Sequence, residues 1–439
     1  MAALVNGRQL KGNGETQVTG VSHDTRQVAK GDLFVAIVGA RLDGHRFLKE
    51  AARKGARAAL VSRQVKGVKL PQVLVKDTTK ALGELGRAQR MQWNGQVVAV
   101  TGSVGKTTVK DMAAHLLGVS YRVLKTEGNL NNQYGLPLTL LKLKPTHEVA
   151  VVELGINHPG EMEWLSEIAR PDIAIVTAIG EAHLGFFKGR RHLASEKMKV
   201  ASALRVGGMK ILNGEDIYLP ERGKNVMTFG LKLGQVKAVE LEPQGLGTRF
   251  MLEAQGATAS THLSLIGNHN VVNALAAVSA GLTLGVPLKK LAARLRSFVP
   301  QARMRMEIKN MKGVLFINDA YNASPTSMEA ALVTFEDLKG PARKWAVLGD
   351  MLELGSFSKE THARIVRRVA EADLSGVILV GERMKEAHRG LSEEEKKRIW
   401  AFTSLSGAKL FLKSRMVAGD AVLLKASRGM RLEKLLEGL

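Results

Sequence analysis

The chain has no cysteine among its 439 residues, which excludes disulfide bonds, metal sites built from thiolates and a cysteine nucleophile. Aromatic residues make up only 5% of it, so few side chains could stack on nucleobases. No apolar run approaches the ~18 residues of a membrane-spanning helix. The first residues also lack the apolar core of a secretory signal. We therefore expect a cytoplasmic protein without a membrane span.

Acidic residues are scarce relative to basic ones: 41 Asp and Glu stand against 64 Lys and Arg, a net charge of +23. Such an excess can indicate a protein that binds nucleic acid or an anionic membrane surface. The basic residues are scattered along the chain, however, and neither zinc-finger spacing nor an RNP-like aromatic motif is present. We therefore predict a solvated basic surface and no nucleic-acid partner.

The length predicts two to four domains, and the residue patterns favour three. Residues 1–94 mix strand-like runs with amphipathic helices. Residues 95–300 repeat strand, loop and helix, and their apolar, β-branched runs are typical of strands buried on both faces of a parallel sheet. Residues 301–439, beyond Pro300, contain four more such runs. We predict an α/β protein with a small mixed N-terminal domain, a central parallel-sheet domain and a Rossmann-like C-terminal domain.

A glycine loop follows the first strand-like run of the central region, in the segment VVAVTGSVGKTTVKDM that begins at Val97. Gly102 and Gly105 allow a tight turn, Lys106 brings a positive charge, and Thr107 offers a hydroxyl to Mg²⁺. Backbone N–H groups and the start of the following helix would add to the attraction for an anion. The pattern predicts a site for a nucleoside triphosphate, formed by Gly102, Ser103, Val104, Gly105, Lys106, Thr107 and Thr108.

The loop is a short form, because Val100 stands where the usual phosphate loop has its first glycine. This short form resembles the loop of the Mur ligases, and further segments resemble that family in the same order. They are DTRQVAKGDLFVAIVGARLDGHRF, TEGNLNNQYGLPLTLL, ELGINHPGEM, IGEAHLGFF, LIGNHNVVNALAA, FINDAYNASPTSMEAAL, LGDMLELG and KASRGMRLEKLL. The resemblance spans nearly the whole chain, and it implies that the central domain is a P-loop-type ATPase domain.

Within the family, the combination of GNLNNQYGLP, DAYNASPTSM and LGDMLELG resembles the members that add D-alanyl-D-alanine to UDP-MurNAc-tripeptide. The resemblance implies that ATP phosphorylates the terminal carboxylate of the tripeptide. The amine of the dipeptide, bound by the C-terminal domain, then attacks the acyl phosphate and gives the pentapeptide precursor of peptidoglycan. The implied cofactors are ATP and Mg²⁺, and we expect a monomer.

Other functions are open alternatives at this point. One is a ligase of the same chemistry with another substrate, such as the Mur ligase that adds the third peptide residue or a folylpolyglutamate synthetase. The other, from a different class, is a P-loop ATPase associated with nucleic acid, which the charge of +23 invites.

The resemblance also implies catalytic and metal-binding residues. Thr107 and Glu153 would coordinate Mg²⁺, and His183 a second Mg²⁺, with Lys197 present as a carbamate. Coulomb's law favours such a modification, because an ammonium about 4 Å from Mg²⁺ would be repelled by about 8 kcal/mol at an effective dielectric constant of about 20. Lys199 is the alternative to Lys197 in register.

For the nucleotide, the resemblance implies that Asn270 and Asn273 help to hold the adenine end and that Arg303 reaches the γ-phosphate. Many relatives have Gly or His before this arginine, whereas Ala302 stands here, so Arg305 is an alternative. The C-terminal domain would close over the nucleotide and shield the acyl phosphate from water. Its implied contact residues are Asp319, Tyr321, Asn322 and Ser324.

The sugar nucleotide is expected on the N-terminal domain, although the Asp-Gly pair in the second of its two segments could simply form a turn. The candidates are Asp24, Thr25, Arg26, Asp43, Gly44 and His45. A polar loop after the first helix of the central domain could bind the peptide or the pyrophosphate through side-chain amides, or could be a plain surface loop. Its candidates are Asn129, Asn131 and Asn132.

Overall fold

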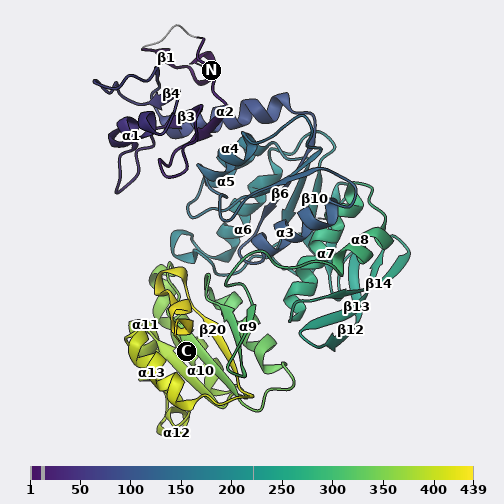
Figure 1. Ribbon diagram of the computed structural model, residues 1–439. Helices are drawn as coiled ribbons and strands as arrows, with labels where there is room; N and C mark the ends of the chain where they lie inside the picture. The colour runs from purple at the N-terminus through teal and green to yellow at the C-terminus, as the bar shows by residue number, and fades with distance from the viewer. Residues whose placement is uncertain (1, 11–14, 221, 439) are drawn as a thin grey trace.

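The structure is a computed structural model that describes residues 2–10, 15–220 and 222–438. Figure 1 shows three α/β units that follow one another from the N-terminus to the C-terminus, each built on its own sheet. The predicted fold class is therefore confirmed. Within the described residues, no helix has both the length and the apolar character needed to cross a membrane.

The N-terminal sheet has the strand order β1-β5-β4-β3-β2, and only β1 runs antiparallel to its neighbour. Its strands are β1 (Arg8–Gln9), β2 (Gly20–Ser22), β3 (Asp32–Val35), β4 (Ala58–Val61) and β5 (Gln72–Leu74). The unit also contains η1 (Ala2–Val5), η2 (Gly44–Phe47), α1 (Leu48–Arg53) and α2 (Thr78–Gln92). Strand β3 is buried on both faces, because Leu33 and Val35 pack towards α2 while Phe34 packs towards α1.

The central sheet has nine strands in the order β14-β13-β12-β11-β10-β9-β6-β8-β7. At one edge of the sheet, β13 and β14 form an antiparallel extension. The strands are β6 (Gln96–Thr101), β7 (Val123–Lys125), β8 (Val149–Glu153), β9 (Ile173–Val176), β10 (Met209–Asn213), β11 (Val226–Gly230), β12 (Val236–Gln244), β13 (Gly247–Ala254) and β14 (Ala257–Leu263). Because β6 pairs in parallel with both β8 and β9, the carboxyl ends of these three strands meet at one edge.

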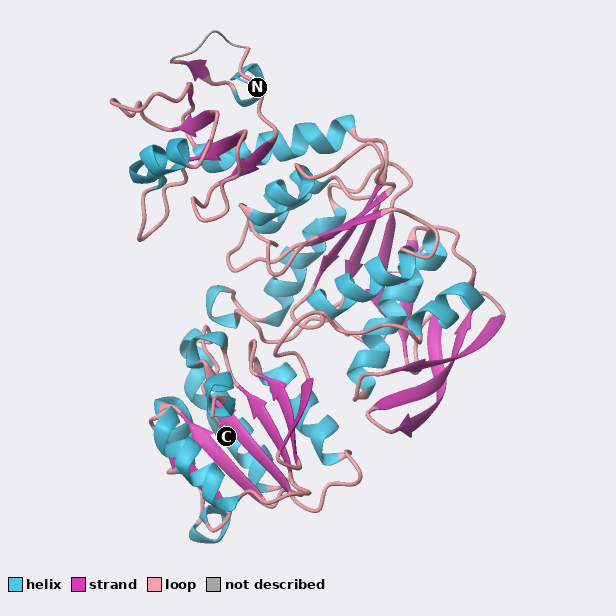
Figure 2. Ribbon diagram, in the orientation of Figure 1, coloured by secondary structure: helices cyan, strands magenta, loops and turns pink. Residues whose placement is uncertain are grey.

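Helices cover both faces of the central sheet (Figure 2). One face carries α3 (Lys106–Leu117), α7 (Asn268–Thr283) and α8 (Leu288–Leu295). The other carries α4 (Gly135–Leu140), α5 (Glu161–Ala169) and α6 (Arg190–Met198), with η3 (Leu184–Phe186) and η4 (Lys199–Ala201) in the connections. The strand residues are buried on both faces, as the β-branched runs predicted.

The C-terminal sheet has the order β15-β16-β20-β17-β18-β19, with β15 antiparallel to the rest. Its strands are β15 (Glu307–Met311), β16 (Val314–Asp319), β17 (Lys344–Gly349), β18 (Gly376–Val380), β19 (Ile399–Phe402) and β20 (Ala421–Lys425). Its helices are α9 (Pro325–Glu336), η5 (Gly355–Phe357), α10 (Ser358–Ala370), α11 (Glu382–His388), α12 (Glu393–Lys396), α13 (Leu405–Arg415), η6 (Arg428–Met430) and η7 (Leu432–Leu436). The four predicted strands correspond to β16, β17, β18 and β20, while the two edge strands were not predicted.

Helix α2 joins the N-terminal unit to the central unit (Figure 1). Gly83 and Gly86 let it lie directly on the central unit, because a Cβ atom at these positions would come within 2.6 Å of the Trp164 ring and 2.7 Å of Pro137 Cα. Near its end the buried Arg90 donates to the carbonyl oxygen of Ala169 (3.1 Å). The two units are therefore packed together through this helix.

Candidate functional site

A cavity of about 980 Å³ lies where the carboxyl ends of the central strands face the C-terminal unit. Its walls come from the glycine loop after β6, the segments that follow β8 and β9, the start of α7, and the ends of β16 and β20. Residues more than 200 positions apart in the sequence thus share one cavity. A cavity of this size and position is typical of a ligand site in an α/β protein.

The conformation of the glycine loop requires glycine at two positions. Gly102 and Gly105 have φ values of 142° and 83°, and a Cβ atom would collide with Thr177 Oγ1 at the first and with Asn273 Oδ1 at the second. Lys106 begins α3, and its Nζ donates to the carbonyl oxygen of Gly102 (2.8 Å). Burial lowers the pKa of this lysine. The loop therefore presents backbone N–H groups, a helix start and an ammonium group to the cavity, which suits a polyphosphate.

Glu153 ends β8 beside the glycine loop, and its side chain is only 2% exposed. Asn131 Nδ2 donates to its Oε1 (2.8 Å), while its Oε2 has no hydrogen-bond partner in the described part of the chain. The ammonium of Lys110 lies 4.0 Å from Oε2. A buried carboxylate oxygen without a donor fits a hard cation, and Mg²⁺ commonly takes one or two protein ligands together with phosphate oxygens. Glu153 and the hydroxyl of Thr107 therefore fit Mg²⁺.

Lys197, on α6, is 1% exposed, and no side-chain hydrogen bond or ion pair joins its ammonium group to another described residue. Its burial, and to a lesser degree the positive charge of Lys106, lower its pKa well below the usual value. Lys199 differs, because it is partly exposed and pairs with Glu196 (2.7 Å). Between the two alternatives in register, only Lys197 is a buried amine near the glycine loop, although it does not line the cavity.

His183 lines the cavity and contacts the C-terminal unit, since its Nδ1 lies 2.6 Å from Glu353 Oε2. This close contact with His183 lowers the pKa of Glu353. The described residues contain no group of three or more His, Asp or Glu side chains that could hold a metal ion. A second Mg²⁺ at His183 would therefore need further ligands from the nucleotide or from a modified Lys197.

Two further residues near His183 tie the central and C-terminal units together. Glu181 is 6% exposed and accepts hydrogen bonds from Arg190 of its own unit and from Arg364 of α10 (2.5 Å to the latter). The backbone N–H of Gly185 donates to the carbonyl oxygen of Glu353 (3.3 Å). These contacts hold the C-terminal unit over one end of the cavity.

Apart from the arginine candidates, the nucleotide-binding candidates on α7 and on the C-terminal unit line the cavity. They are Asn270, Asn273, Asp319, Tyr321, Asn322 and Ser324. Asn273 Nδ2 donates to Asn270 Oδ1 (3.3 Å), and Asn270 Nδ2 donates to the carbonyl oxygen of Ile266 (2.9 Å). Ser324 caps α9 and so supports the loop that contains Tyr321 and Asn322.

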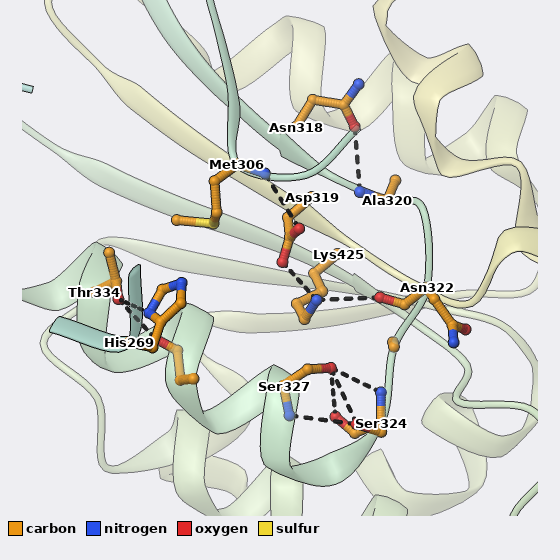
Figure 3. Close-up of polar contacts among 12 residues, drawn as sticks. His269, Met306, Asn318, Asp319, Ala320, Asn322, Ser324, Ser327, Thr334 and Lys425 are labelled. Atoms are coloured by element: carbon orange, nitrogen blue, oxygen red, sulfur yellow. Dashed lines mark hydrogen bonds and ion pairs between the residues drawn. The ribbon is translucent and has the colours of Figure 1, made fainter. Parts of the chain in front are cut away.

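Figure 3 shows how Asp319 is held at this wall of the cavity. The buried ammonium of Lys425, at the end of β20, donates to Asp319 Oδ2 (2.5 Å) and to the carbonyl oxygen of Asn322 (3.1 Å). The N–H of Met306 donates to Asp319 Oδ1 (3.2 Å). His269, on α7, lies beside Thr334 of α9 (3.3 Å between Nδ1 and Oγ1), and burial lowers its pKa to about 4. It is therefore neutral at pH 7.

The two arginine alternatives lie in different places. Arg303 is exposed and does not line the cavity, so the structure does not support its prediction as the nucleotide-binding arginine. Arg305 lines the cavity, with its guanidinium 4.1 Å from the centre of the Tyr321 ring. The structure therefore favours Arg305.

The predicted sugar-nucleotide residues lie on the N-terminal unit and do not line the cavity. Asp24 pairs with Arg26 (2.6 Å), which lowers the pKa of Asp24 to about 2, and Thr25 lies between them. Asp43 accepts from the N–H of His45 (3.0 Å) at the start of η2, and Gly44 has no room for a side chain against Ile37. Asp43-Gly44 therefore forms a structural turn at the start of η2.

The three asparagines of the polar loop line the cavity, and each has a different environment. Asn131 donates to Glu153, as described above. Asn132 Oδ1 accepts from the N–H groups of Tyr134 (3.1 Å) and Gly135 (3.0 Å), so it stabilises the start of α4. For Asn129, the structure gives no side-chain hydrogen bond within the described residues.

The sequence analysis missed several residues of the cavity wall: His158, Trp164, His269 and Lys425. A signal for Lys425 exists, because it is the one charged residue within the apolar run AVLLKA, at the carboxyl end of a predicted strand. No comparable signal marks Trp164, which could equally belong to a helix core.

Comparisons with known proteins show the family of this chain. The family model described as "Mur ligase family, catalytic domain" matches residues 17–90, the "Mur ligase middle domain" residues 100–281, and the "Mur ligase, glutamate ligase domain" residues 304–428. A relative from Bacillus subtilis named UDP-N-acetylmuramoyl-tripeptide–D-alanyl-D-alanine ligase is 37% identical, over 97% of this chain and 94% of its own length. The ligase of the same name from Escherichia coli is 34% identical, over 97% and 96%.

Solved structures give the same result. A crystal structure of MurF from Acinetobacter baumannii has a TM-score of 0.92 at 34% identity, covering 99% of this chain and 96% of that one. A MurF ligase from Thermotoga maritima in complex with ADP has a TM-score of 0.83 at 32% identity, covering 96% of each chain. Full-length identity above 30%, together with three matching domains, means that this chain belongs to the Mur ligase family.

Proposed function

We propose that this chain is an ATP-dependent ligase that adds D-alanyl-D-alanine to UDP-MurNAc-tripeptide. The reaction forms a C–N bond through an acyl phosphate, releases ADP and phosphate, and serves peptidoglycan synthesis. Relatives named for this activity match over nearly their whole length. The observation that carries the proposal is the unpartnered Glu153 carboxylate oxygen next to the Gly102–Thr108 loop, in a cavity covered by the C-terminal unit.

The first step brings two anions together, the tripeptide carboxylate and the γ-phosphate of ATP, so the site must neutralise charge and align atoms. The glycine loop and Lys106 would hold the phosphates from one side. Arg305 would face them from another, next to Asp319 and Tyr321. Glu153 and Thr107 would hold Mg²⁺, which would supply further positive charge to the phosphates.

Lys197 would complete the site as a carbamate. Burial lowers the pKa of this amine well below its usual value, so the amine loses its proton more readily and becomes a better nucleophile. Its nitrogen can add to CO₂ with loss of one proton, which replaces a positive charge by a negative carboxylate. The carbamate oxygens would then be available near Lys106 of the glycine loop.

The C-terminal unit would exclude water from the acyl phosphate and bind the incoming dipeptide. The contacts of Glu181 with Arg364 and of His183 with Glu353 support a closed position of this unit. The uridine end of the sugar nucleotide would lie on the N-terminal unit, at the segments that contain Asp24–Arg26 and Asp43–His45. Asn129 and Asn131 would face the peptide on its way to the cavity. A monomer located in the cytoplasm stays a prediction.

The test is an assay of phosphate release and product mass with ATP, Mg²⁺ and UDP-MurNAc-tripeptide, with either D-alanyl-D-alanine or single amino acids as acceptor. We expect phosphate release with the dipeptide and a product heavier by the dipeptide. Release with single amino acids, but not with the dipeptide, would favour another ligase of the family. ATP turnover that rises with added DNA or RNA, and falls steeply with salt, would favour a nucleic-acid-associated ATPase.

A further inference from the structure

We infer that Met304 and Met306 are positioning residues whose left-handed backbone aims Arg305 into the nucleotide cavity. The inference rests on the proposed ATP site. It concerns the segment that connects the central unit to β15 and so joins the two walls of the cavity.

Both methionines have a backbone conformation that is rare for residues other than glycine. Met304 has a φ of 58° and Met306 a φ of 53°, and Arg305 stands between them. A single left-handed residue with a Cβ atom is uncommon, and such residues persist only where their surroundings determine them. Two of them flanking one arginine, at a cavity wall, indicate a segment shaped for a purpose other than stability.

The surroundings that hold this conformation all belong to the C-terminal unit. Glu307 Oε2 accepts from the N–H of Met304 (3.0 Å), and the N–H of Tyr321 donates to the carbonyl oxygen of Met304 (3.1 Å). Asp319 Oδ1 accepts from the N–H of Met306 (3.2 Å), and Lys425 in turn holds Asp319. The conformation therefore depends on the ends of β16 and β20.

The result is that the guanidinium of Arg305 lies over Tyr321 and lines the cavity, next to Thr108 and Asn270 of the central unit. After burial, the positive charge of Arg305 also contributes to the lowered pKa of Lys106. Two cations that face one another across a cavity are suited to an anion between them. Arg303, in the same segment but before the left-handed pair, is exposed to solvent. The backbone thus selects which arginine can meet the nucleotide.

The test uses a substitution that disfavours left-handed backbone without changing charge. Met304→Val introduces a side chain that branches at Cβ, for which positive φ is a strong outlier, whereas Met304→Leu does not branch at Cβ and serves as the matched conservative variant. ATP affinity is measured by isothermal titration calorimetry with Mg²⁺ and no peptide substrate. Binding of UDP-MurNAc-tripeptide is measured as a control for folding.

We expect Met304→Val to weaken ATP binding about tenfold, the scale of one charge-assisted hydrogen bond. Met304→Leu should bind ATP with nearly the wild-type affinity. Arg305→Ala should weaken it by a similar factor. In the Arg305→Ala background, Met304→Val should not weaken ATP binding further, because its effect is to displace the Arg305 side chain. A merely structural role of Met304 would give the same loss in both backgrounds.

The inference is overturned if Met304→Val binds ATP as the wild type does, if Met304→Leu is as weak as the valine variant, or if the losses of Met304→Val and Arg305→Ala add up. It is also overturned if Arg305→Ala leaves ATP affinity unchanged. Failure of the proposed function looks different: Lys106→Ala would then bind ATP as tightly as the wild type.

Discussion

Replacing Asn131 by alanine should raise the Mg²⁺ concentration that the enzyme needs. Asn131 Nδ2 donates to Glu153 Oε1 (2.8 Å) and is the one hydrogen-bond donor to this carboxylate side chain in the described residues. The competing partner is Lys110, whose ammonium lies 4.0 Å from Glu153 Oε2. Without the amide, the carboxylate is free to turn towards Lys110 and away from the phosphate loop.

The size of the effect follows from Coulomb's law. At an effective dielectric constant of about 20, the attraction between the two charges is about 4 kcal/mol at the present separation and about 6 kcal/mol at hydrogen-bond distance. Both side chains are only 2% exposed, so solvent screens the pair little. Mg²⁺ has to overcome this gain of about 2 kcal/mol, which corresponds to a roughly twenty- to thirtyfold higher Mg²⁺ requirement.

The assay is phosphate release at saturating ATP and peptide substrates, with Mg²⁺ varied. Asn131→Ala should shift the half-saturating Mg²⁺ concentration upwards by that factor, and the double variant Asn131→Ala, Lys110→Met should recover most of the shift. Asn129→Ala is the matched control, since Asn129 lines the same cavity but makes no hydrogen bond to Glu153. A wild-type Mg²⁺ dependence of Asn131→Ala, or no recovery in the double variant, would refute the reasoning.

Three further predictions concern other parts of the molecule. Lys106→Ala should abolish turnover but leave UDP-MurNAc-tripeptide binding measurable, because that substrate is expected on the N-terminal unit; loss of both would contradict this division. Burial lowers the pKa of His269 to about 4, below the 6.5 of the unfolded chain, so the unfolded state binds more protons. The free energy of unfolding should therefore be highest above pH 6.5 and fall by up to about 3 kcal/mol as the pH decreases towards 4. The melting temperature of His269→Gln should depend less on pH over this range. Arg364→Ala removes the donor that the C-terminal unit gives to Glu181, while Arg190 still neutralises this carboxylate. Its melting temperature should be unchanged, but its radius of gyration by small-angle X-ray scattering should increase; an unchanged radius would mean that the contact does not hold the closed position.

The sequence predicted those parts of the fold that depend on local pattern. The apolar runs that became β6, β8 and β9 are buried on both faces, so their composition alone marks them as central strands of a parallel sheet. Strands β15 and β19 lie at the edges of their sheet, are more polar or partly exposed, and escaped prediction for that reason.

The candidate site was predictable where one short segment carries the chemistry, as in the Gly102–Thr108 loop. The site was not predictable where the backbone conformation determines which side chain reaches the cavity. Arg303 and Arg305 stand two positions apart in QARMRM, and nothing in these letters reveals that Met304 and Met306 are left-handed. That conformation depends on hydrogen bonds to Glu307 and Asp319, and so it exists only once the C-terminal sheet has formed.

Helix α2 has a consequence for anyone who divides or recombines this protein. Its glycines fit against Trp164 and Pro137, and its Arg90 satisfies carbonyl groups that follow α5, so the helix is as much a part of the second unit as of the first. Chimaeras that exchange the first unit for that of a relative should take their crossover before Thr78 and leave the native helix in place. A fragment that starts after this helix would expose the parts of Trp164 and Pro137 against which Gly83 and Gly86 pack.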